Sequence, residues 1–254
     1  MTTGLELNLM FFAVTIPAVL WAGISKGGFG SGAAFAATPM LALILDPGLA
    51  VGLMLPLLMV MDISLLRPYW GKWSWPNAKV LILGAVPGTA IGAAIYGAVD
   101  ADTFRVMIGV VALGFVLFQG ARKIGLLRVK QHEFRPLAGA IWGMVGGFTS
   151  FISHAGGPPV AMHLLSQKLD KLTYQATSVI VFWIINILKF IPYAWLGIFT
   201  WETALADIYL VPVAVIGTWA GVYAHRLVPE RIYFAIAYAM LVLAGGKLLF
   251  DGLT

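Results

Sequence analysis

Two short stretches of the sequence combine glycines with side chains that could hold an anion. The first runs Ser25-Lys26-Gly27-Gly28-Phe29-Gly30-Ser31-Gly32, and the second runs Ser153-His154-Ala155-Gly156-Gly157-Pro158. Each lies between two apolar runs, where crowded glycines indicate a break in a helix rather than a surface loop. A helix that begins inside a membrane directs free N–H groups and a partial positive charge at its own N-terminus. Such a helix start stabilises an anion.

The candidate anion-binding residues offer a full positive charge, hydroxyl and imidazole groups, and backbone that an anion can approach closely. They are Ser25, Lys26, Gly28, Gly30, Ser31, Gly32, Ser153, His154, Gly156 and Gly157. Each has a structural alternative. Lys26 could extend to the membrane surface, and His154 could bond a neighbouring carbonyl. The serines could only cap helices, and the glycines could only let helices pack closely.

Four further polar residues lie within the apolar runs: Asp62, Gln175, Asn186 and Lys189. A charge at membrane depth costs about 2.5–3.5 kcal/mol on insertion scales, so it normally has a partner or a water-filled cavity. Asp62 and Asn186 are interpreted as supports that bond the backbone of the glycine-rich stretches. Lys189 follows Asn186 by three residues on the same helix face. It could pair with the anion, pair with Asp62 or extend to the surface.

The composition places these residues in an integral membrane protein. Of 254 residues, 60% are hydrophobic and 11% are charged, whereas soluble domains contain about 25% charged residues. The apolar runs are long enough to cross a hydrocarbon core about 30 Å thick, and they lack the alternation of barrel strands. The fold class is therefore all-α and polytopic. The net charge of +5 is attributed to basic cytoplasmic loops rather than to nucleic-acid binding.

Ten helical segments are predicted in two halves. They span residues 8–25, 31–45, 49–70, 76–98, 103–124, 137–153, 157–167, 172–196, 203–225 and 230–251. The second and seventh are short and follow the glycine-rich stretches, so both are expected to be partial crossings. A basic linker at 125–135 separates an N-terminal repeat, 1–124, from a C-terminal repeat, 136–254, within one transmembrane domain.

The halves resemble each other through paired positions at a nearly constant offset. The pairs include Leu45-Asp46 with Leu169-Asp170, Asp62-Ile63 with Asn186-Ile187, and Val86-Pro87 with Val211-Pro212. The connection 67–79 is basic, whereas its counterpart 197–203 contains no Lys or Arg. Because cytoplasmic loops are enriched in Lys and Arg, equivalent loops are predicted on opposite faces of the membrane. The halves are thus expected to be inverted repeats, with broken helices meeting near the bilayer midplane and both termini outside.

The glycine-rich stretches resemble the two signatures of the sulfite exporter TauE/SafE family. Residues 28–34 followed by Pro39, and residues 154–159, carry the resemblance, which extends over nearly the whole chain in length and duplication. It implies a multi-pass protein of a bacterial cytoplasmic (inner) membrane. It also implies export of sulfite or a small organosulfonate, such as sulfoacetate or sulfolactate.

An anion that leaves a cell with a negative interior gains about 2.3 kcal/mol per charge per 100 mV. The predicted mechanism is therefore alternating access driven by the anion gradient and the membrane potential. Proton coupling stays open, because His154 and Asp62 could carry protons. A cation carrier or channel is the main alternative, although cation binding would require carboxylates at the helix breaks.

No enzyme activity, metal or cofactor is expected, since the four histidines show no metal-ligand spacing. The expected partners are a small anion and the lipid bilayer, without nucleic acid. A homodimer is left open.

Overall fold

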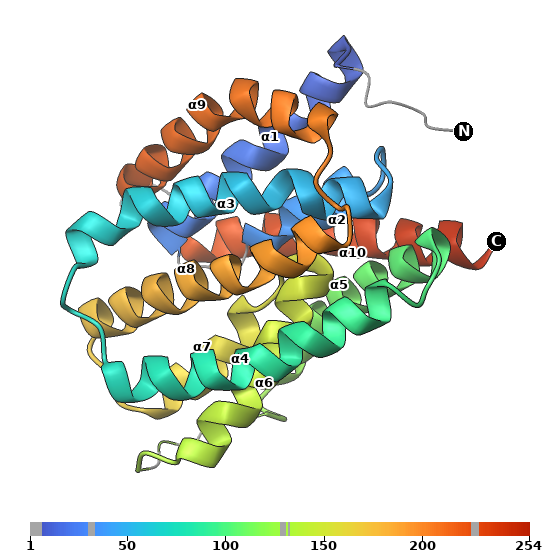
Figure 1. The fold of residues 1–254 in the computed structure, drawn as a ribbon. Coiled ribbons are helices and arrows are strands. Elements are labelled where there is room, and N and C mark those ends of the chain that lie inside the picture. The colour runs from blue at the N-terminus through green and yellow to red at the C-terminus, as the bar shows by residue number, and fades with distance from the viewer. Residues whose placement is uncertain (1–6, 30–33, 128–130, 132, 225–228) are drawn as a thin grey trace.

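This computed structural model describes residues 7–29, 34–127, 131, 133–224 and 229–254. All secondary structure in these ranges is helical, as the composition predicted (Figure 1). The α-helices are α1 (Leu9–Ile24), α2 (Ala37–Leu41), α3 (Pro47–Tyr69), α4 (Trp75–Tyr96), α5 (Ala101–Lys123), α6 (Pro136–Ser153), α7 (Gly157–Ser166), α8 (Lys171–Trp195), α9 (Trp201–Ala224) and α10 (Glu230–Leu253). A π-helical turn (Ser25–Phe29) continues α1, and a 3-10 turn (Ala34–Ala36) precedes α2.

Eight of these helices are long and apolar enough to cross a membrane in the described ranges. The chain is therefore a multi-pass integral membrane protein. The other two, α2 with 5 residues and α7 with 10, are shorter than the roughly 20 residues that a crossing needs.

The predicted segment 31–45 is helical only over 34–41 within the described ranges. The helical segment ends early because a new helix, α3, starts shortly after it, at Pro47. Asp46 caps that helix: its side chain accepts a hydrogen bond from the Gly48 N–H at 2.8 Å. Pro47 occupies the first helical position, so the chain must turn before it.

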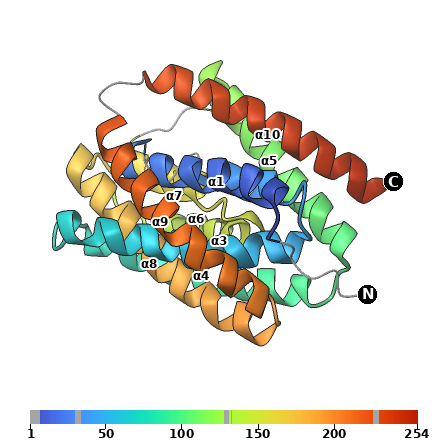
Figure 2. The ribbon, with the colours of Figure 1, turned by 90° about the horizontal axis from the view of Figure 1, so that it is seen from above.

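The helices are arranged around a central pair, α3 and α8, which pack against each other. In both, 61% of the apolar stretch is buried, against 28% in α5. Three further pairs surround this centre: α4 with α6, α1 with α9, and α5 with α10. The α5–α10 pair lies at one edge of the bundle (Figure 2). α9 also packs against α3, and α4 against α8.

Glycines let two of these pairs approach backbone to backbone. A Cβ atom added at Gly88 of α4 would lie 2.0 Å from the Met144 carbonyl oxygen of α6. At Gly27, beside α9, it would lie 2.0 Å from the Thr218 carbonyl oxygen. Any side chain there would force the helices apart, so close packing is one role of the glycines in this fold.

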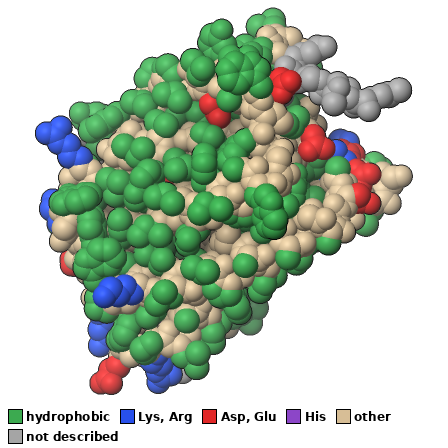
Figure 3. Space-filling model, in the orientation of Figure 1, with side chains coloured by type: hydrophobic (Ala, Val, Ile, Leu, Met, Phe, Trp, Pro, Cys, Tyr) green, Lys and Arg blue, Asp and Glu red, His purple; other side chains and the backbone are tan. Residues whose placement is uncertain are grey.

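The two ends of the bundle differ in charge (Figure 3). We call the end at which α3 ends and α4 and α8 begin the basic end; Arg67, Lys72, Lys79, Lys123 and Lys171 lie there. At the opposite, acidic end lie Asp46, Asp100, Asp102, Glu202 and Asp251. The first described residues and the C-terminus both lie at the acidic end (Figure 1).

Candidate functional site

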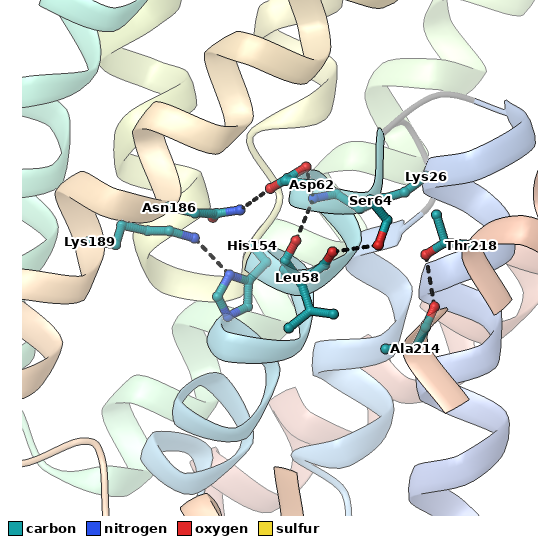
Figure 4. Close-up of polar contacts among 10 residues, drawn as sticks. Lys26, Leu58, Asp62, Ser64, His154, Asn186, Lys189, Ala214 and Thr218 are labelled. Carbon is teal, nitrogen blue, oxygen red and sulfur yellow. Dashed lines mark hydrogen bonds and ion pairs between the residues drawn. The ribbon is translucent and has the colours of Figure 1, made fainter. Parts of the chain in front are cut away.

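Five polar side chains lie in one buried cluster between the central helices and form two hydrogen-bonded groups (Figure 4). We call this the central cluster; it contains Lys26, Asp62, His154, Asn186 and Lys189. Each of the five has at most 8% of its surface exposed. They come from the π-helical turn after α1, from α3, from the end of α6 and from α8. The cluster thus joins four separate parts of the chain.

The first part of the cluster is an ion pair with its support. Lys26 Nζ lies 2.5 Å from Asp62 Oδ1 and donates to the Leu58 carbonyl oxygen at 3.3 Å. Asn186 Nδ2 donates to the other carboxylate oxygen, Asp62 Oδ2, at 2.7 Å. Both carboxylate oxygens therefore have donors, as a buried charge requires. The charge of Lys26 is balanced within the protein.

The second part of the cluster surrounds Lys189. Its Nζ lies 2.7 Å from His154 Nδ1 and donates to the Ser150 carbonyl oxygen at 3.2 Å. His154 Nε2 lies 3.0 Å from the Val51 carbonyl oxygen. One tautomer satisfies both contacts of the ring: a neutral imidazole that accepts at Nδ1 and donates from Nε2. Among the described residues, no carboxylate lies within ion-pair distance of Lys189.

The protonated cluster therefore holds two lysines and one carboxylate. Asp62 balances Lys26, and the partners of Lys189 are all neutral. When Lys189 is protonated, one positive charge is left without a counter-charge inside the bundle, where an unbalanced charge is costly. An anion bound beside Lys189 would remove that cost.

Two irregular backbone conformations position Lys26 and His154 in the cluster. The π-helical turn at Ser25–Phe29 widens the end of α1 next to α3, and such turns often occur at functional sites. His154 adopts a left-handed conformation with φ of 56°, and its N–H bonds the Ser150 carbonyl oxygen at 2.9 Å. This geometry ends α6 and leads into α7, which begins at Gly157 with Pro158 in its first turn.

The structure brings most of the sequence-predicted residues to this region. Ser25 and Ser153 are fully buried, and Ser153 Oγ has no hydrogen-bond partner among the described residues. Gly156 precedes the first residue of α7, Gly157. Gln175 lines a cavity of about 10 Å³ together with Lys26 and Asp62.

Gly28 lies in the π-helical turn. Gly30, Ser31 and Gly32 lie outside the described residues, and so does the helix start predicted there. An anion-binding role for the whole set stays a prediction.

Sequence reasoning did not find how these residues pair. It placed Asp62 and Asn186 against loop backbone, whereas the two side chains bond each other. It also missed Tyr193, whose hydroxyl donates to the Phe151 carbonyl oxygen at 2.6 Å. A signal was present, because Asn186, Lys189 and Tyr193 are spaced by three and four residues, which puts them on one face of α8.

The described ranges contain no group of three His, Asp or Glu side chains that could share a metal ion. The cluster provides lysine ammonium groups and hydrogen-bond donors in a buried environment.

Comparison with known proteins agrees with the glycine-rich signatures. The family model described as sulfite exporter TauE/SafE matches residues 15–248. The chain is also similar to the probable membrane transporter protein YunE of Bacillus subtilis (strain 168), with 24% identity over 229 residues covering 82% of each chain. No solved structure matches it. Because the family match spans far more than half of the chain, the protein belongs to the sulfite exporter TauE/SafE family of membrane transporters.

Proposed function

We propose that the protein exports a small sulfur-containing anion, sulfite or a C2 or C3 organosulfonate, by alternating access. The family match supports a transporter of this class. The observation that carries the anion assignment is that Lys189 has no carboxylate within ion-pair distance among the described residues. A protonated Lys189 would attract an anion and repel a cation, because a cation would add to the uncompensated positive charge.

The donors around Lys189 fit an oxyanion. An ammonium group has three N–H donors, and two of those of Lys189 are used by Ser150 and His154. The third is left for a ligand. Ser153, next to His154 in the chain, has a buried hydroxyl without a partner in the described ranges. A sulfite or sulfonate group carries several oxygens that accept hydrogen bonds, so one such group could use both donors.

The packing supports the repeat on which alternating access rests. If α1 to α5 are exchanged with α6 to α10 in order, the α4–α6 pair becomes α9–α1, and α3–α9 becomes α8–α4. The pairs α3–α8 and α5–α10 map onto themselves. This is the pattern expected of two similar halves related by a pseudo-two-fold axis.

The charges at the two ends of the bundle support an orientation. We infer that the basic end faces the cytoplasm and that both termini face outward. Export of an anion is then driven by its gradient and by the membrane potential.

A binding measurement tests the proposal. Detergent-purified protein is titrated with sulfite, sulfoacetate, sulfolactate, sulfate and acetate while thermal unfolding is followed. A ligand at 100 times its Kd stabilises the folded state by about 2.7 kcal/mol. We expect stabilisation by sulfite or a sulfonate, and its loss in Lys189→Gln. The matched control is Lys171→Gln, which removes an exposed lysine from the start of the same helix.

Stabilisation by none of the anions, or equal stabilisation of wild type and Lys189→Gln, would refute the assignment.

One observation favours a proton-coupled version of the transporter. Asp207 of α9 is 8% exposed, and its Oδ1 has no hydrogen-bond partner among the described residues. Buried carboxyl groups in membrane helices are common proton carriers. In proteoliposomes, coupling would appear as anion flux that responds to a pH gradient in wild type and no longer in Asp207→Asn.

A further inference from the structure

One face of α8 runs past the whole central cluster. Gln175, Ser178, Phe182, Asn186, Lys189 and Tyr193 are spaced by three or four residues, so they line one side of the helix. The face begins near the basic end with a partly exposed glutamine and ends near the acidic end with a fully buried tyrosine. The two ends of this face therefore differ in their access to solvent.

On the basic side, a small cavity with polar and apolar walls lies against the ion pair. Its volume is about 10 Å³, and its lining consists of Lys26, Asp62, Leu65, Gln175, Ser178, Val179 and Phe182. That volume is close to the space of a single water molecule. Phe182 also packs against the start of α7, since a Cβ atom at Gly156 would lie 3.1 Å from its ring. The cavity thus connects polar groups of α8 with the cluster, and a phenyl ring narrows it.

On the acidic side, the cluster is covered by an aromatic plug, which we define as Tyr96, Phe151, Tyr193 and Phe199. The Tyr193 ring lies 4.8 Å from that of Phe151 and 5.9 Å from that of Phe199, and Tyr96 lies 6.4 Å from Phe151. The His154 ring lies 6.3 Å from that of Tyr193. Tyr193 and Phe151 are fully buried, so the plug separates His154 from the acidic end.

We propose that the central cluster is reached from the basic end through a passage along Gln175, Ser178 and Phe182, and that the aromatic plug is the gate at the acidic end. In the conformation of the structure the gate is closed. The passage holds about one water in this conformation and must widen for an anion to enter, and the amide of Gln175 and the hydroxyl of Ser178 then supply hydrogen bonds to that anion. The inference rests on the proposed function for the identity of that anion.

A wider pocket of about 240 Å³ beside α5 and α6 is a poorer route. Its walls are mostly apolar, and the single hydroxyl proton of Thr149 is already taken up by one of the Val145 and Ala155 carbonyl oxygens, which lie 2.9 and 3.0 Å away. An anion there would lose its hydration without gaining donors.

The sequence contains no cysteine, so single cysteines can report access without a background. Ser178→Cys probes the passage and Val51→Cys probes the acidic side of the cluster, where Val51 is fully buried. Exposed references mark the two faces: Lys72→Cys at the basic end and Glu202→Cys at the acidic end. A charged, membrane-impermeant thiol reagent is applied separately to each face of sealed vesicles.

We expect Ser178→Cys to be modified from the face that modifies Lys72→Cys and not from the other face. Val51→Cys should resist modification from both. Adding Phe151→Ala to Val51→Cys should raise its modification from the Glu202→Cys face by about tenfold or more. Gln175→Cys repeats the passage test at the entrance, in case the serine variant does not fold.

Modification of both passage cysteines from the acidic-end face, or of neither cysteine in folded protein, would overturn the passage. An unchanged rate for Val51→Cys after Phe151→Ala would overturn the gate. Labelling needs no transported anion, so these outcomes are independent of whether sulfite or a sulfonate binds. If an anion does stabilise the protein, the same anion should slow the labelling of Ser178→Cys.

Discussion

The Lys26–Asp62 ion pair gives a quantitative test of the cluster. Both side chains are almost fully buried, at 6% and 1% exposure, and Nζ and Oδ1 are 2.5 Å apart. Removing one partner of a buried pair leaves the other charge uncompensated and costs about 3–5 kcal/mol. Replacing both partners with neutral groups is close to neutral. Asp62→Asn should therefore destabilise the protein strongly, and Lys26→Met combined with Asp62→Asn should restore most of the loss.

The assay is thermal unfolding of the purified protein in detergent without ligand. For a chain of this size, 1 kcal/mol corresponds to about 2–4 °C in Tm, so Asp62→Asn should lower Tm by about 6–20 °C. The single oxygen of the new amide can accept from Asn186 or from Lys26 but not from both, so the change removes the charge together with one acceptor. A loss below about 1 kcal/mol in Asp62→Asn, or a double variant as unstable as the sum of the single ones, would refute the reasoning.

Two further predictions concern packing and helix starts. Gly88→Ala should destabilise the protein, because its Cβ would lie 2.0 Å from the Met144 carbonyl oxygen, whereas Gly246→Ala, with nothing within 4 Å, should be neutral or stabilising; thermal unfolding of both compares them. Hydrogen bonds from the Thr173 side chain and from its N–H hold the pKa of Asp170 below its usual value. A carboxylate with a lowered pKa contributes stability above its unfolded-state pKa of about 3.9. Asp170→Ala should therefore lower Tm at pH 7, and its difference from wild type should shrink as pH falls below about 4, a trend that Tm measurements against pH would show.

The helices could be predicted because their ends carry local signals. The segment predicted at 172–196 is α8, Lys171–Trp195, which begins after the capping residue Asp170 and ends near Gly197, a residue with φ of 68°. Segment 76–98 is α4 for the same kind of reason, since Pro76 stands in its first turn. The length of an apolar run and the residues that start or stop a helix are local features of the chain, so the sequence alone can show them.

The contacts of the cluster could not be predicted in this way. Lys26 and Asp62 are 36 residues apart, and their meeting depends on the π-helical turn that widens the end of α1. The left-handed conformation of His154 has no sequence signal either, because glycine is the residue expected there. Both features are irregularities that tertiary packing imposes, and both lie at the candidate site.

In the proposed repeat, three paired positions of the cluster differ between the halves, Lys26 with His154, Asp62 with Asn186 and Leu65 with Lys189, and together they leave two lysines against one carboxylate. Lys26 follows Ser25 at the end of α1, and His154 follows Ser153 at the end of α6; each contacts the central helix of its own half. The N-terminal half places a carboxylate on that helix, whereas the C-terminal half has the neutral Asn186 at the equivalent position.

Asn186→Asp would make the halves alike at the Asp62 position and add a carboxylate three residues before Lys189. With both acids ionised, the cluster would hold two carboxylates and two lysines, with no charge left for a substrate. The new carboxylate would also replace the amide that donates to Asp62 Oδ2 at 2.7 Å, and the two acids would repel each other. We expect this variant to be less stable than wild type without ligand and to lose anion stabilisation as completely as Lys189→Gln, although every donor around Lys189 is retained. Thermal titration with the anion that stabilises wild type would decide. Retained stabilisation would mean that hydrogen-bond donors, rather than net charge, hold the anion.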